Sequence, residues 1–169
     1  MEIRRYRESD DIDDVSRVYA QSWKTAYRGI VPQDFLDALA DNRWSPILMN
    51  ETSNLLIAAE GGDIVGAATY CPARDRAFAG WGEIISLYLV PQYWRRGIGT
   101  RLLREAMKAL HDLGYQKLYL WVLEENRVAR TFYEKNGFRL NGDRVSAEVG
   151  GKPLSEVRYI HTAEKPACR

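Results

Sequence analysis

The residues best suited to chemistry lie where an apolar run meets two arginines and two glycines, just ahead of an amphipathic helix. Backbone N–H groups at a helix N-terminus lack intrahelical partners and lie at the positive end of the helix dipole, so they attract anions. Glycine lets a phosphate approach the backbone closely, and arginine adds positive charge. The pattern therefore predicts a pyrophosphate-binding site at six consecutive residues: Arg95, Arg96, Gly97, Ile98, Gly99 and Thr100.

Two common phosphate-binding motifs match this segment poorly. The P-loop motif, GxxxxGK[ST], requires a lysine after its second glycine, and no lysine follows Gly99. The dinucleotide-binding motif, GxGxxG, requires a third glycine, and Leu102 stands at that position. In addition, no Asp or Glu closes the next predicted strand at 118–122. The P-loop is therefore excluded, and the dinucleotide-binding motif is a weak match.

A third phosphate-binding motif fits the segment. Trp94-Arg95-Arg96-Gly97-Ile98-Gly99 resembles motif A of the GNAT superfamily of N-acetyltransferases, [Q/R]-x-x-G-x-[G/A], and departs from it at Trp94. Residues 118–137, LYLWVLEENRVARTFYEKNG, resemble motif B of the same superfamily. The resemblance implies that the pyrophosphate is that of acetyl-CoA, used as a cosubstrate. It also implies a GNAT fold, in which this segment joins the fourth strand to the third helix.

The implied activity is transfer of the acetyl group of acetyl-CoA to a primary amine of a small molecule or of a protein or peptide. The amine must lose a proton, the carbonyl oxygen must be stabilised as an oxyanion, and the departing thiolate benefits from a proton. The alternative function is a non-catalytic module that binds acyl-CoA for sensing or for contacts with partners. Catalytic side chains discriminate between the two, because binding alone needs neither an acid nor a base.

Tyr133 is the candidate acid. It lies in the same predicted helix as Asn126, and their spacing places both on nearly one face. The resemblance implies that the Tyr133 phenol protonates the leaving sulfur and that Asn126 both caps the helix and binds the pantetheine arm. The alternative for Tyr133 is ordinary packing, with its hydroxyl bonded to the backbone.

Glu83 is the candidate base. It lies near the start of the predicted central strand, in the register that the catalytic glutamate has in the histone acetyltransferase branch of the superfamily. The base position of the branch that acetylates ribosomal proteins is occupied here by Trp121, so that base is absent. A charged residue at a strand start and deprotonation through ordered water remain the alternatives for Glu83.

Main-chain groups of the central strand are expected to hold the rest of the cosubstrate. The family separates its fourth and fifth strands, and the pantetheine arm pairs with the exposed edge, which here contains Leu87 and Leu89. The resemblance makes the Leu89 amide the oxyanion donor. Tyr88 lies between them and points to the other face, and all three side chains are predicted to pack within the sheet.

The acceptor site is expected where the first two helices meet. Trp23 and Tyr27 are four residues apart and share a helix face, so their rings can line a pocket or stack on a cationic amine. Packing against the sheet is the alternative for Trp23. Trp81 and Trp121 are weaker candidates, and the predicted loop at 140–155 would help to shape the cleft.

The strands and helices that must position these residues are recognised by two different spacings of apolar residues. Apolar patterns and turn residues predict strands at 2–7, 54–59, 64–70, 83–90, 117–122, 138–140 and 156–161. Helical spacing and caps predict helices from about 10 to 23, and at 32–40, 97–113 and 126–135. This order predicts an α/β protein with a mixed sheet and helices on both faces. The resemblance adds that the sheet is mostly antiparallel, six- to seven-stranded, with splayed central strands.

Length and composition narrow the function classes. A chain of 169 residues predicts one domain over 1–169, and the net charge of +1 gives no support for nucleic-acid or membrane binding. The N-terminus lacks the apolar core of a signal peptide, and Cys71 and Cys168 are isolated, so we expect a cytoplasmic protein without disulfides. Two cysteines and two histidines also argue against a metal site. The resemblance makes a homodimer possible.

Overall fold

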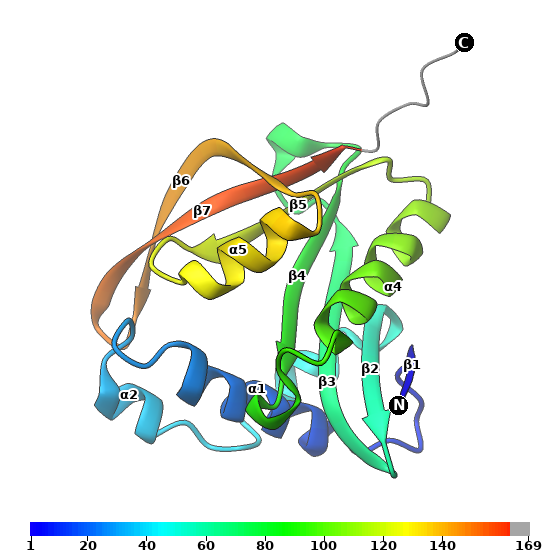
Figure 1. Cartoon of the computed structure of the whole chain (residues 1–169), viewed down its shortest axis with the longest axis vertical. Helices are drawn as coiled ribbons and strands as arrows, with labels where there is room; N and C mark the ends of the chain where they lie inside the picture. Colours follow the sequence, from blue (N-terminus) through cyan, green and yellow to red (C-terminus); the bar gives the residue numbers. More distant parts are fainter. Residues whose placement is uncertain (163–169) are drawn as a thin grey trace.

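The computed structural model describes residues 1–162 (Figure 1). Its strands are β1 (Glu2–Arg5), β2 (Leu55–Glu60), β3 (Asp63–Pro72), β4 (Gly82–Leu89), β5 (Lys117–Leu123), β6 (Arg139–Val149) and β7 (Lys152–Thr162). Its α-helices are α1 (Ile12–Ala26), α2 (Gln33–Asp37), α3 (Ser45–Leu48), α4 (Ile98–Asp112) and α5 (Arg127–Lys135). Short 3-10 helices are η1 (Thr52–Asn54), η2 (Arg76–Phe78) and η3 (Pro91–Tyr93).

The strands form a 7-stranded sheet in the order β1-β2-β3-β4-β5-β7-β6. Across residues 1–162, neighbouring strands are antiparallel except for β4 and β5, which are parallel. Figure 1 shows α4 and α5 in front of the sheet, with α1 behind it. The predicted α/β fold, a mixed and mostly antiparallel sheet with helices on both faces, is confirmed.

Alternation along β2 sends neighbouring side chains into two separate cores. Leu56 packs in the cluster that contains Leu102 of α4. Leu55 and Ile57 pack in the cluster that contains Val15 of α1. A strand that is apolar on both faces must be covered on both, and burial of these clusters on α1 and α4 fixes the two helices to opposite sides of the sheet.

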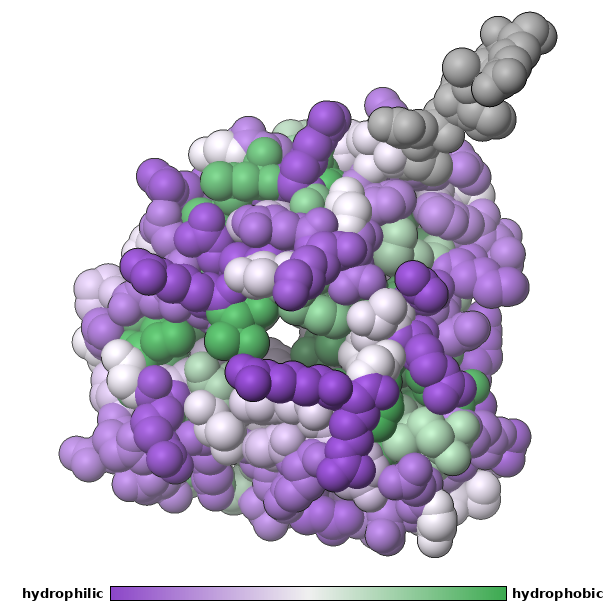
Figure 2. Space-filling view, in the orientation of Figure 1, coloured by the Kyte–Doolittle hydropathy of each residue, from purple (hydrophilic) through white to green (hydrophobic). Residues whose placement is uncertain are grey.

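A β-bulge in β4 marks the point beyond which β4 and β5 no longer pair. Ile84 pairs with Tyr70 and Ser86 pairs with Thr69, which leaves Ile85 as an extra residue on β4. Such a residue bends the strand and interrupts its ladder. The pairing of β4 with β5 ends at Ile84, immediately before the bulge, so the two strands diverge beyond it. Figure 2 shows an opening through the molecule, where Figure 1 places the gap between β4 and α5.

The largest departure from the predicted elements is the hairpin of β6 and β7. The loop predicted at 140–155 is wrong, because strand pairing continues to Val149 and Lys152 on either side of a tight turn. Gly150 and Gly151 both have positive φ, 59° and 77°, as a two-residue hairpin turn requires. Most β6 side chains are exposed, so the strand lacks the apolar alternation by which strands are recognised in a sequence.

Candidate active site

The start of α4 forms the predicted anion cradle. Gly97 is the N-cap residue, with a left-handed φ of 76°, and Arg95 also has a positive φ, 59°. The Arg101 amide donates to the Gly97 carbonyl at 3.1 Å. The amides of the preceding residues, including Gly99 and Thr100, come before the first bond of the helix. They are therefore available to an anion beside the loop.

The two glycines of the cradle have different roles. A Cβ built on Gly97 would meet nothing within 4 Å, so its outer side is open. A Cβ on Gly99 would lie 3.3 Å from Leu89 Cδ1 and 3.5 Å from Phe132 Cε2, so this residue lets α4 approach the sheet and α5 closely. The open side of Gly97, with exposed Arg95 and Arg96 beside it, fits the pyrophosphate of acetyl-CoA.

Trp94, which departs from the family motif, ties the cradle to β4. Its indole Nε1 donates to the Leu89 carbonyl at 2.8 Å. Further along the loop, the Arg96 guanidinium lies over the Tyr93 ring, 5.1 Å from its centroid. The tryptophan therefore fixes the loop by a side-chain hydrogen bond at the end of the strand that borders the opening.

The separated half of β4 presents an unpaired backbone edge towards β5. The Val90 amide donates to the Val65 carbonyl at 2.9 Å, on the β3 side. Because strand amides alternate in direction, those of Leu87 and Leu89 point to the β5 side, where β4 has no partner in the described chain. The Tyr88 ring lies against Tyr19 of α1, at a centroid distance of 4.6 Å. This edge fits an extended pantetheine arm.

Tyr133 and Asn126 both lie in or next to α5. Asn126 caps the helix, because its Oδ1 accepts from the Ala129 amide at 3.1 Å. Tyr133 is 8% exposed and its hydroxyl makes no hydrogen bond within residues 1–162. Burial and the neighbouring Tyr88 raise the pKa of Tyr133, so its phenol stays protonated at neutral pH. The backbone-bonded alternative for this hydroxyl therefore has no support.

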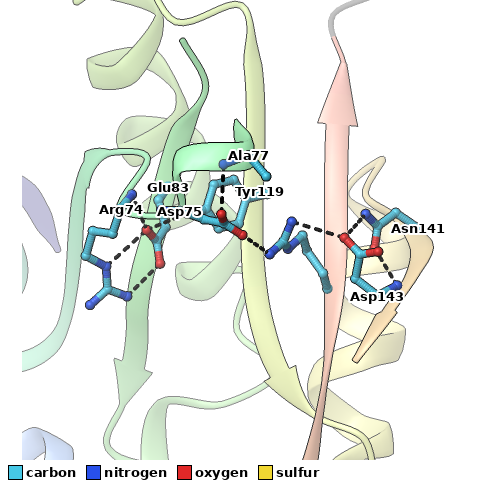
Figure 3. A network of polar contacts seen from close by, with 8 residues as sticks. Arg74, Asp75, Ala77, Glu83, Tyr119, Asn141 and Asp143 are labelled. Atoms are coloured by element: carbon cyan, nitrogen blue, oxygen red, sulfur yellow. Dashed lines mark hydrogen bonds and ion pairs between the residues drawn. The ribbon is translucent and has the colours of Figure 1, made fainter. Parts of the chain in front are cut away.

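Glu83 lies in a network of ion pairs and hydrogen bonds (Figure 3). Arg74 donates from Nη2 to one carboxylate oxygen at 2.6 Å and from Nε to the other at 3.0 Å, while the Tyr119 hydroxyl donates at 2.7 Å. Burial alone would raise the pKa of Glu83, but the hydrogen bonds outweigh it and lower that pKa. A low pKa makes a carboxylate a weaker proton acceptor. The role of Glu83 as the base stays a prediction.

Aromatic side chains line the side of the sheet covered by α1. The rings of Trp23 and Tyr27 meet edge to face at 4.8 Å, and the Tyr27 and Tyr88 hydroxyls lie 3.5 Å apart. The buried indole N–H of Trp23 has no hydrogen-bond partner in the described residues. The two weaker tryptophan candidates have other partners: Trp81 meets Phe78 edge to face, and Trp121 lies under Arg158.

Glu156 of β7 is a site residue that the sequence did not single out. It was expected only as the first residue of a strand at 156–161. Its carboxylate is close enough to the aromatic group to raise the pKa of Tyr27 and Tyr88, together with the larger effect of burial. The one signal in the sequence was that Glu156 lies two residues after Leu154, and therefore on the same face of the strand, which faces the protein interior.

Three further features can be described for residues 1–162: membrane-spanning helices, metal-binding clusters and free cysteines. Within residues 1–162, no helix is long and apolar enough to cross a membrane. The same residues hold no cluster of three or more His, Cys, Asp or Glu side chains arranged to bind a metal ion. Cys71 is a free thiol, and Cys168 lies outside the described residues.

Comparisons with known proteins show the family of this chain. The model of the Acetyltransferase (GNAT) family matches residues 16–138. The chain is 29% identical over 153 residues to the uncharacterized N-acetyltransferase YuaI of Bacillus subtilis, covering 88% of this chain and 86% of that protein. It is also 29% identical over 147 residues to the spermidine N(1)-acetyltransferase of Thermoplasma acidophilum, covering 83% of this chain and 89% of that protein.

A solved structure shares the whole architecture. The PaiA N-acetyltransferase of Thermoplasma acidophilum, in complex with coenzyme A, superposes with a TM-score of 0.74 at 25% identity. The superposition covers 95% of this chain and 98% of that one. The family match contains the cradle at Gly97, the open edge of β4 and Tyr133. The chain therefore belongs to the GNAT family of acetyltransferases.

Proposed function

We propose that this protein transfers the acetyl group of acetyl-CoA to a primary amine of a small molecule or peptide. The observation that carries the proposal is the Tyr133 hydroxyl, which is protonated, free of hydrogen bonds within residues 1–162, and close to Tyr88 on the strand with the open edge. Pure binding of an acyl-CoA needs no such group. The names of the related acetyltransferases support the same reaction.

Each part of the site has a role in the proposed reaction. The amides at the start of α4, with Arg95 and Arg96, hold the pyrophosphate, and the β4 edge holds the pantetheine arm. Acetyl-CoA supplies the acetyl thioester. The Leu89 amide donates to the carbonyl oxygen as negative charge develops there, and Tyr133 gives its proton to the departing sulfur. Two carboxylates, Glu83 and Glu156, are available near the amine side.

Release of free CoA thiol with a panel of primary amines tests the proposal. We expect turnover above the rate of thioester hydrolysis with at least one amine. We also expect Tyr133→Phe to lower kcat by roughly 10²–10³-fold, the usual contribution of a positioned acid, with little change in affinity for acetyl-CoA. Tyr70→Phe is the matched control, because Tyr70 lies in the same core cluster and also has an unpartnered hydroxyl.

The outcomes separate the enzyme from the alternative function. Tight binding of acetyl-CoA without turnover on any amine would favour a non-catalytic acyl-CoA-binding module. Turnover that Tyr133→Phe leaves unchanged would keep the enzyme and remove Tyr133 from its mechanism.

A further inference from the structure

Glu156 carries an ionisable side chain that the proposed reaction has not yet used. It pairs across the β5–β7 ladder with Leu123, so the two residues lie on the same face of the sheet. Leu123 in turn packs in the cluster that Trp23 and Tyr27 join, which is the aromatic side of the opening. The backbone register therefore places the Glu156 carboxylate on the acceptor side of the sheet.

The carboxylate has no partner of its own. It is partly buried, and it makes no hydrogen bond or ion pair within residues 1–162. The titratable groups close enough to interact with it electrostatically are Tyr27, Tyr88 and Arg74. Arg158, two residues along β7, is already paired with Asp75 and Asp143. Partial burial of a carboxylate without a partner has a cost, and a cationic ligand would offset it.

Of the carboxylates of Glu83 and Glu156, only that of Glu156 is left without a cationic partner within residues 1–162. Arg74 is engaged by Glu83 through two hydrogen bonds, so this pair is close to neutral. Burial raises the pKa of Glu156, although the Arg74 charge opposes the shift. This is opposite to Glu83, whose pKa is lowered. Of the two carboxylates, Glu156 is therefore the better proton acceptor near neutral pH.

We propose that Glu156 binds the ammonium group of the acceptor and takes one of its protons as the nitrogen attacks the thioester. The inference rests on the proposed acetyl transfer and names a residue and a substrate class for it. The acceptor is a primary amine that is cationic in solution. The faces of Tyr27 and Tyr88 hold this cation beside the carboxylate, since aromatic rings attract ammonium groups.

The protons and bonds of the step balance. The ammonium nitrogen gives one proton to Glu156 and then forms the bond to the acetyl carbon while the carbon–sulfur bond breaks. The departing sulfur takes a proton from Tyr133. The second proton lost by the nitrogen restores the phenol, and Glu156 returns its proton to water. The sum is one amide, one free thiol and one released proton.

Glu156→Gln tests the proposal, with Glu148→Gln as the matched control. Glu148 lies exposed on β6 of the same hairpin, so the control makes the same change of charge away from the opening. We expect Glu156→Gln to lower kcat/KM for the amine by roughly 10²-fold or more, the scale of a lost base. The KM for acetyl-CoA should stay unchanged, and Glu156→Asp should recover part of the activity.

The dependence of kcat/KM on pH distinguishes a catalytic role of Glu156 from a structural one, because loss of a purely structural contact would not change the shape of this dependence. In the wild type, kcat/KM rises as Glu156 loses its proton and is then level towards the amine pKa of ~10. In Glu156→Gln, only the free amine can react, so the rate should keep rising up to that pKa. An unchanged profile and an unchanged kcat/KM in this variant would overturn the proposal.

Thermal unfolding without substrates provides a second readout. A raised pKa in the folded state means that Glu156 favours folding below its unfolded pKa of ~4.3, and that this contribution is lost as pH rises through the folded pKa. The Tm of Glu156→Gln should therefore equal or exceed that of the wild type at pH 7, and the difference should shrink towards pH 4. A lower Tm at pH 7 would assign the carboxylate a structural role instead.

Failure of this inference can be told from failure of the proposed function. An active wild type with an equally active Glu156→Gln contradicts only the role of Glu156. A wild type that releases no thiol with any amine contradicts the proposed acetyl transfer itself.

Discussion

Arg158 of β7 is a buried charged residue packed on aromatic rings, and its replacement by methionine should destabilise the fold clearly. Its side chain is 6% exposed and lies over three aromatic rings, 3.8 Å from the centroid of Phe78, 4.3 Å from that of Trp121 and 5.0 Å from that of Tyr119. Methionine keeps the apolar stem and removes the charge, so the experiment isolates the guanidinium.

The expected loss follows from these contacts. Desolvated cation–π contacts contribute about 2 kcal/mol. The ion pairs with Asp75 and Asp143 together add less than about 1 kcal/mol, because those side chains are 36% and 48% exposed. The carboxylates left behind, which Figure 3 labels as Asp75 and Asp143, are partly exposed to water, so the larger penalty of an abandoned buried charge does not apply. The sum is ~2–3 kcal/mol, or a fall in Tm of roughly 4–12 °C for a domain of this size.

Urea unfolding of Arg158→Met and of a control, Arg144→Met, measures this loss. Arg144 lies on the neighbouring strand and pairs with Glu124 at 2.6 Å, but its side chain is 62% exposed. An exposed pair of this kind contributes less than about 0.5 kcal/mol. Equal stability of the two variants would refute the argument that the aromatic surroundings, rather than the ion pair, make Arg158 important.

Two further substitutions test the predicted phosphate-binding cradle at Gly97 and the ion pair of the Glu83 carboxylate. Gly97→Ala places a Cβ on the open side of the cradle at a φ of 76°, so we expect the KM for acetyl-CoA to rise roughly tenfold, ~1.4 kcal/mol. Gly142→Ala, at a φ of 94° and also without neighbours, should leave that KM unchanged, and an equal effect would reduce the result to backbone strain. Glu83→Gln should be less stable than the wild type at pH 7, because a lowered pKa stabilises the fold above the unfolded value of ~4.3. Tm measurements should show that difference vanish as the pH falls through the folded pKa of Glu83, and a difference that is independent of pH would contradict the ion pair with Arg74.

Features that depend on neighbouring residues in the chain could be predicted from the sequence. The start of α4 at Gly97, the cap of α5 at Asn126 and the spacing to Tyr133 are all set within a few residues. Local hydrogen bonds and glycine conformations decide such features, so they need no knowledge of the rest of the fold. The position of the predicted cradle followed from such local signals, whereas the role of Tyr133 as the acid came from the resemblance of residues 118–137 to motif B and stays a prediction.

Features that depend on strands far apart in the chain could not be predicted. The bulge at Ile85 is visible only in the register between β3 and β4. The engagement of Glu83 by Arg74, and the exposure of Glu156 to the aromatic side, depend on how β4, β5 and β7 pair. In each case the surroundings of the side chain come from residues far away in the sequence. For this reason two glutamates can have opposite pKa shifts: the pKa of Glu83 is lowered and that of Glu156 is raised.

The bulge at Ile85 has a consequence for how this sheet avoids unwanted association. Beyond it, β4 is an edge strand in the interior of the molecule, and edge strands normally invite pairing with other chains. Here that edge lies inside the strand order, between β3 and β5, and not at the margins of the sheet formed by β1 and β6. The unpaired backbone of β4 thus lies away from the sheet margins, where strands of other chains most readily pair.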